Sequence, residues 1–158
     1  MPTDDTLWLS RSGWTATADS VTVSSQGPDK ALDGTSTPWW SGAGYPHWIA
    51  FDLGSPQTFD QLEYVFATGN TDRPALIEIY TSDDGTDWGT AIASADWSAL
   101  TGQVYIRFAS QTKQHVKVVG LTGATTTKMA CREFYMLVDH GICHNLWSAT
   151  ASSTDTTY

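Results

Sequence analysis

Hydrophobic and polar residues alternate along much of the chain with the two-residue period of a β-strand. The clearest case is residues 47–53, where Ile49, Phe51 and Leu53 share one face and Gly54 ends the run. The period of 3.6 residues that marks an amphipathic helix is not convincing anywhere. The pattern therefore predicts an all-β protein.

The same pattern predicts about eight short strands separated by turns rich in Gly, Pro, Asn and Asp. We expect them at residues 7–10, 14–18, 47–53, 61–67, 75–80, 104–108, 116–118 and 131–138. The last is apolar almost throughout, which predicts a central strand buried on both faces, whereas residues 91–100 are ambiguous. The expected fold is an antiparallel β-sandwich, a jelly roll of about eight strands.

The stretch from Asp29 to Ser41 does not fit this alternation. The Asp33-Gly34 pair and Pro38 exclude a long helix or a regular strand there. A run of this kind keeps one shape only if something fixes it. We expect a bound hard cation on one side and tryptophan packing on the other.

Length and composition indicate one domain, residues 1–139, and a short tail, residues 140–158. The 158 residues are 41% hydrophobic and 12% aromatic, as in a globular protein. Seventeen acidic and eight basic residues give a formal charge of −9. This charge argues against nucleic acid and anionic lipid as partners, and it is compatible with neutral sugars and cations.

The tail contains a weak internal repeat. Residues 147–153 resemble residues 14–20, as if a second copy of the first strand began there. The alternative is an ordinary polar tail. An unpaired strand of this kind could also add to the sheet of a neighbouring subunit and form a homo-oligomer. No signal peptide is visible, so the protein acts where it is made, has lost its leader or leaves the cell within an assembly. We expect an extracellular, cell-surface or virion location.

Two cysteines leave more than one interpretation open. Cys131 and Cys143 could pair in an oxidising compartment. Together with His140 and His144 they could also bind zinc, but the spacing matches no standard zinc pattern. The simplest alternative is a buried Cys131.

The order of several short motifs resembles the discoidin family, the coagulation factor V/VIII C-type domains, which includes the family-32 carbohydrate-binding modules. The resemblance extends over about residues 7–139. Its motifs are Trp14-Thr15-Ala16-Thr17-Ala18, Lys30-Ala31-Leu32-Asp33-Gly34, Trp48-Ile49-Ala50-Phe51-Asp52-Leu53-Gly54, Arg73-Pro74, Ser82-Asp83-Asp84-Gly85-Thr86-Asp87-Trp88, Tyr105-Ile106-Arg107-Phe108 and Arg132-Glu133-Phe134. This resemblance implies a β-sandwich jelly roll.

The resemblance also implies a structural calcium ion in the turn-rich stretch. The implied ligands are Lys30, Asp33, Thr35, Thr37, Arg132 and Glu133. Pro38 stands where the family usually has Thr, so either Thr37 replaces it or the site is weaker. Independently, a carboxylate in an apolar strand needs a partner, and for Glu133 that partner is either the cation or an Arg or Lys side chain.

Sugars bind to an aromatic ring under their apolar face and to planar polar groups on their hydroxyls. The candidate ligand-binding residues are Trp39, Ser41, Tyr45, His47, Asn70, Asp72 and Arg73, with residues 124–129 as a wall. Ser41 stands where galactose-binding relatives have His. We expect Trp39 to be the exposed ring and Trp40, Trp48 and Trp88 to belong to the core.

No hydrolase, metalloprotease, P-loop or dinucleotide motif is present, so we expect no catalysis. The leading hypothesis is a non-catalytic carbohydrate-binding or adhesion module with a glycan as partner. The alternative is a structural protein of a virion, such as a decoration, head-fibre or tail component, that uses the tail for subunit contacts.

Overall fold

The computed structural model describes residues 6–67, 69 and 72–139. The C-terminal tail lies outside these residues. The expectations of a second copy, of a subunit contact and of zinc binding through His140, Cys143 and His144 therefore concern a segment that the structure does not describe.

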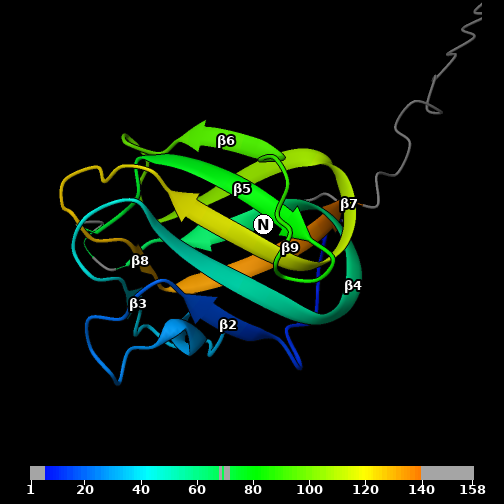
Figure 1. The fold of residues 1–158 in the computed structure, drawn as a ribbon, viewed down its shortest axis with the longest axis horizontal. Helices are drawn as coiled ribbons and strands as arrows, with labels where there is room; N and C mark the ends of the chain where they lie inside the picture. The colour runs from blue at the N-terminus through cyan, green and yellow to red at the C-terminus, as the bar shows by residue number, and fades with distance from the viewer. Residues whose placement is uncertain (1–5, 68, 70–71, 140–158) are drawn as a thin grey trace, which may run out of the picture.

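The described residues form nine strands and one turn of 3-10 helix (Figure 1). The elements are β1 (Thr6–Trp8), β2 (Thr15–Ala18), η1 (Pro28–Ala31), β3 (Trp39–Trp40), β4 (His47–Val65), β5 (Leu76–Ser82), β6 (Ala93–Asp96), β7 (Gln103–Gly120), β8 (Ala130–Cys131) and β9 (Glu133–Asp139). Among these elements, none is a helix with the length and apolar character needed to span a bilayer. The expected all-β class is confirmed.

All sheet pairings are antiparallel. Seven strands form one sheet in the order β1-β9-β4-β7-β5-β6, with β2 paired to β4, and β3 pairs with β8 in a small second sheet. The expected central strand is β9, which lies between β1 and β4. The ambiguous residues 91–100 contain the edge strand β6 and the buried Trp97.

The two long strands β4 and β7 build the sandwich from a single sheet. Each was expected as two separate strands, but each is continuous and curves round at the same end of the molecule, on the right in Figure 1. The first part of β4 pairs with β2 and the last part with β9, and its register with β7 shifts after Asp52 and after Phe59. These shifts bend the strands so that one sheet forms both layers.

The core between the layers is aromatic. Phe51 stacks on Phe134 with ring centroids 3.8 Å apart, which joins the two halves of the sandwich. Trp97 packs against Tyr64 and Phe66 with centroid distances of 5.2 and 5.9 Å. Cys131 is buried, and it forms no disulfide bond within the described residues.

One carboxylate on β4 is buried without full compensation. Glu63 is 2% exposed, and its Oε2 has no hydrogen-bond partner among the described residues. Burial raises the pKa of Glu63, although a hydrogen bond with Tyr105 opposes the shift. A raised carboxylate pKa means that the folded state resists losing this proton, so the free energy of unfolding falls as pH rises through the folded pKa.

We therefore expect Glu63→Gln to stabilise the domain at neutral pH by about 1–3 kcal/mol, because the amide removes the cost of burying a charged carboxylate without full compensation. The gain should shrink on acidification and vanish below about pH 4, where Glu63 is protonated in both folded and unfolded chains. Thermal unfolding across this pH range measures it. Glu78→Gln, at a half-buried position on β5, is the control. A gain that is equal at acidic and neutral pH would contradict the prediction.

Candidate functional site

Three connecting segments meet at one end of the sandwich, which we call the loop end: residues 41–47, 72–74 and 121–129. Backbone hydrogen bonds join them, from Gly44 N to the Thr127 carbonyl (2.9 Å) and from Ala124 N to the Arg73 carbonyl (3.1 Å). Figure 1 shows these segments on the left, opposite the curved parts of β4 and β7. The sequence therefore brings most of its predicted ligand-binding residues to one place.

Trp39 and Trp40 exchange their expected roles. They form the two-residue strand β3, in which adjacent side chains point to opposite faces. Trp39 is fully buried, and its Nε1 donates to the Ser20 carbonyl at 3.0 Å. The expectation of an exposed Trp39 ring is thus wrong, because the strand turns this side chain into the core.

Trp40 is the half-buried tryptophan of the loop end, and the Lys128 ammonium lies 5.9 Å from its ring centroid. Trp48 and Trp88 are also half-buried rather than core residues. Neither Trp40 nor Lys128 was expected among the ligand-binding residues, although both lie at the loop end. The signal that could have found Trp40 is the alternation of side chains within β3.

Ser41 and His47 hold the loop end together and have no free polar atoms for a ligand. The Ser41 hydroxyl donates to the Gly42 carbonyl and accepts from Met129 N, both at 2.8 Å. His47 is 3% exposed. Its Nδ1 lies 2.7 Å from Asp19 Oδ2 and its Nε2 lies 3.2 Å from the Thr127 carbonyl. Both residues were expected to contact the ligand, but their partners within the protein already occupy them.

The remaining predicted residues are half-buried at the loop end. The Tyr45 hydroxyl donates to the Lys128 carbonyl at 2.7 Å, and burial raises its pKa. Asp72 Oδ1 accepts from the Thr126 hydroxyl at 2.7 Å. Arg73 Nη2 donates to the Ser98 carbonyl at 2.5 Å. Asn70 lies outside the described residues.

The expected cation site contains two carboxylates that influence each other. Asp33 accepts from Thr35 N at 2.8 Å and pairs with the Lys30 ammonium at 3.1 Å. Its negative charge contributes to the raised pKa of Glu133, for which burial is the main cause. Gly34, at φ +75°, provides the left-handed backbone conformation of the turn that follows Asp33.

Glu133 has a protein partner as well. Arg11 Nη1 lies 2.5 Å from Glu133 Oε2 and 3.3 Å from the carbonyls of Ala31 and Phe134. The alternative in which Glu133 pairs with an Arg or Lys side chain is therefore realised. Within the described residues, no group of three or more His, Cys, Asp or Glu side chains is arranged to hold a metal.

The residues present are nevertheless compatible with calcium. Arg11 binds Glu133 Oε2, and a hydrogen bond from the Gly34 backbone N–H lowers the pKa of the same carboxylate against the effect of burial, while Oε1 is buried. Calcium prefers carboxylate and carbonyl oxygens, and both kinds occur around Asp33 and Glu133. A bound cation could use Oε1 of Glu133, because Arg11 contacts Oε2.

The chain matches a family model described as the F5/8 type C domain over residues 15–134. The chain belongs to the F5/8 type C domain family. Discoidin is another name for this family, so the resemblance inferred from the motifs is confirmed.

F5/8 type C domains in two curated proteins are similar to this one. A galactose oxidase of Gibberella zeae is 30% identical over 125 residues, which is 73% of this chain and 18% of the oxidase. A sialidase of Micromonospora viridifaciens is 34% identical over 107 residues, 63% of this chain and 16% of the sialidase. The chain thus spans less than a fifth of the length of either relative.

Solved structures with the same fold include several isolated modules. Chitosan-binding module 1 of a chitosanase/glucanase from Paenibacillus sp. IK-5 is 30% identical, with a TM-score of 0.67 over 77% of this chain and 92% of that module. A CBM32 module from Clostridium perfringens, solved with GalNAc-β-1,3-galactose, has 22% identity and a TM-score of 0.75 over 84% of this chain and 99% of that one. These matches confirm the β-sandwich.

Proposed function

We propose that this F5/8 type C domain is a non-catalytic carbohydrate-binding or adhesion module that recognises a glycan outside the cell. The observation that carries the proposal is the match to a chitosan-binding module. That module is 30% identical to this chain, and the match covers 92% of its length. Modules of the same fold solved with galactose and with GalNAc give further support.

The proposed site is the loop end, with Trp40 as its aromatic surface. A sugar ring placed against the indole would lie beside the Lys128 ammonium, which could donate to its hydroxyls. The carboxylate of Asp72 and the guanidinium of Arg73 offer further polar groups at the same end. The hydrogen bonds of Ser41, Tyr45 and His47 keep the segments in place, so little ordering is required when the sugar binds.

A glycan array with the wild-type chain tests the proposed function. We expect binding to at least one of the sugars named for the similar modules: galactose, N-acetylgalactosamine, chitosan or 4,5-unsaturated mannuronic acid. A chain that is folded by circular dichroism but binds no glycan on the array would overturn the proposal.

A structural calcium ion is the second part of the proposal. It would be held by oxygen atoms of Lys30, Asp33, Thr35, Thr37, Arg132 and Glu133. The ion would bring the turn-rich stretch against the start of β9, and the burial of the Glu133 carboxylate within the electrostatic influence of Asp33 supports it. Its role would be to stabilise the fold.

Calcium added to chelator-treated protein is therefore expected to raise the melting temperature. A ligand that binds only the folded state at a hundredfold excess over its Kd stabilises by about 2.7 kcal/mol. Asp33→Asn keeps an acceptor for Thr35 N but removes the charge, so this variant should lose the response to calcium. Magnesium is the control, because it requires a smaller, more regular site. A melting temperature insensitive to calcium would contradict this part of the proposal.

A further inference from the structure

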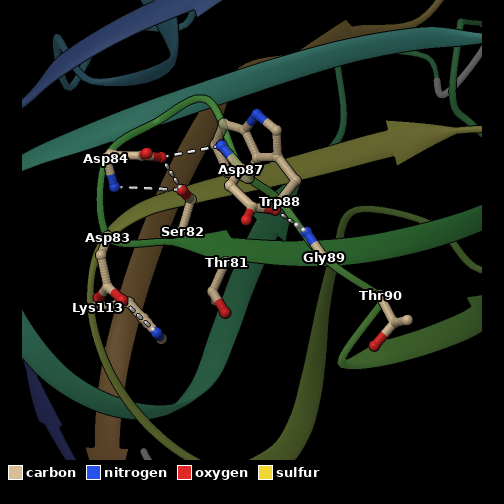
Figure 2. Close-up of a pocket in the computed structure, with 9 residues that line it drawn as sticks. All are labelled: Thr81, Ser82, Asp83, Asp84, Asp87, Trp88, Gly89, Thr90 and Lys113. Carbon is tan, nitrogen blue, oxygen red and sulfur yellow. Dashed lines mark hydrogen bonds and ion pairs between the residues drawn. The ribbon is translucent and has the colours of Figure 1, made fainter.

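A hollow of about 390 Å³ lies beside Trp88, where β5 ends and the following loop begins (Figure 2). Its lining includes Thr81, Asp83, Asp87, Trp88, Thr90 and Lys113. A second hollow of about 280 Å³ is lined by Thr15, Thr17, Asp52 and His115, and Trp88 borders this one too. The larger volume falls within the range of about 300–1,000 Å³ that small-molecule sites occupy.

Hydrogen bonds within the loop that carries Trp88 fix its conformation. Asp84 Oδ1 accepts from the backbone N–H of Thr86 and Asp87 at 2.8 and 2.9 Å and from the Ser82 hydroxyl at 2.9 Å. The Lys117 ammonium lies 4.2 Å from the Trp88 ring centroid. The indole is thus held in place at the border of two hollows, and a ligand would not have to order it.

The polar groups of the larger hollow suit a ligand rich in hydroxyls. Asp83 Oδ2 and the Lys113 ammonium lie 2.7 Å apart, and Asp87 Oδ1 accepts from Gly89 N at 3.2 Å. Figure 2 shows these side chains and the hydroxyls of Thr81 and Thr90 around the same space. Carboxylates accept and an ammonium donates, which complements sugar hydroxyls that do both.

The charges of the hollow restrict the ligand class. Three carboxylates, those of Asp83, Asp84 and Asp87, and one ammonium, that of Lys113, line the hollow, and the Lys117 ammonium over the Trp88 ring adds a second positive charge beside it. This excess of negative charge disfavours uronates, phosphates and other anions. An uncharged sugar residue against Trp88 has no such cost.

We propose that the Trp88 hollow is a second saccharide-binding site, which takes an uncharged sugar. This inference shares its ligand class with the proposed function but concerns a different part of the molecule. The strand β5 separates the hollow from the loop end, because it starts beside Pro74 and runs seven residues to Ser82. At about 3.3 Å per residue the two places are about 20 Å apart, so one polysaccharide could occupy both and bind with avidity.

Titration of the ¹⁵N-labelled chain with galactose, followed by NMR, tests this site. We expect shifts of the Trp88 indole N–H and of the Gly89 and Thr90 amides, separate from those of the loop end. Asp87→Ala and Lys113→Ala should weaken the response at Trp88 severalfold and leave the loop-end signals unchanged. Asp87 is exposed and Lys113 is half-buried, and neither belongs to the core, so the fold should persist. The spectrum of each free variant checks this.

The outcomes separate this inference from the proposed function. Shifts confined to the loop end would overturn the second site and leave the proposed function standing. Shifts at Trp88 alone would support the second site and overturn the placement of the proposed glycan site at the loop end. The absence of shifts with every sugar of the array would overturn both the second site and the proposed function. A mannuronate oligosaccharide that shifts the Trp88 signals as strongly as galactose would overturn the uncharged ligand class.

Discussion

Trp39→Ala is expected to lower the free energy of unfolding by about 3–5 kcal/mol, the usual cost of removing a large aromatic side chain from a core. Trp39 is fully buried, and its indole N–H donates to the Ser20 carbonyl. The substitution therefore opens a cavity and removes the partner of a carbonyl group. This loss is a large part of the 5–15 kcal/mol by which domains of this kind are stable.

Trp40→Ala is the matched control for this prediction, because Trp40 is the neighbouring residue in the same strand and is only half-buried. Chemical denaturation of both variants gives the comparison. Trp39→Ala should shift the midpoint far more than Trp40→Ala. Equal shifts would mean that β3 does not direct the two side chains to opposite faces.

Glu133→Ala is expected to destabilise the domain by about 3 kcal/mol when measured in the presence of a chelator. The Glu133 side chain is 7% exposed, and that of its partner Arg11 is 18% exposed. Removal of one member of a buried pair leaves the other charge uncompensated, which typically costs about 3–5 kcal/mol. The value lies at the lower end here because solvent partly screens Arg11.

A double variant separates the contribution of the ion pair to the free energy of unfolding from the contribution of the side-chain volume. Arg11→Met combined with Glu133→Leu removes both charges but keeps apolar volume, and such replacements often recover the stability that a single substitution loses. We expect the double variant to be more stable than Glu133→Ala in chemical denaturation. A double variant that is less stable than Glu133→Ala would contradict the account of Glu133 as the buried partner of Arg11.

The sequence predicted the sandwich because alternation is strongest where a strand has one buried face. Residues 47–53 show this well, and Ile49, Phe51 and Leu53 are all buried as expected. The continuity of β4 was not visible, because Gly54, Ser55 and Pro56 look like a turn. In the structure the strand bends there without ending, and its pairing with β7 resumes at Gln57.

The site was harder to predict because its contacts join distant parts of the chain. The period of a strand cannot be read from two residues, so β3 did not reveal which tryptophan faces the core. Asp19 and His47 are 28 positions apart, and Arg11 and Glu133 are 122 apart. Which residues become partners at such separations depends on the register of the sheet. The local sequence does not reveal this register.

The most direct test of the central claim is the affinity of Trp40→Ala for the glycan that the wild-type chain binds best, measured by titration calorimetry. Trp8→Ala is the control, since Trp8 is an exposed tryptophan on the edge strand β1, outside the loop end. We predict at least about tenfold weaker binding for Trp40→Ala, a loss of about 1.4 kcal/mol, and unchanged binding for Trp8→Ala. Equal affinity of Trp40→Ala and the wild type would contradict the claim that the loop end recognises the glycan.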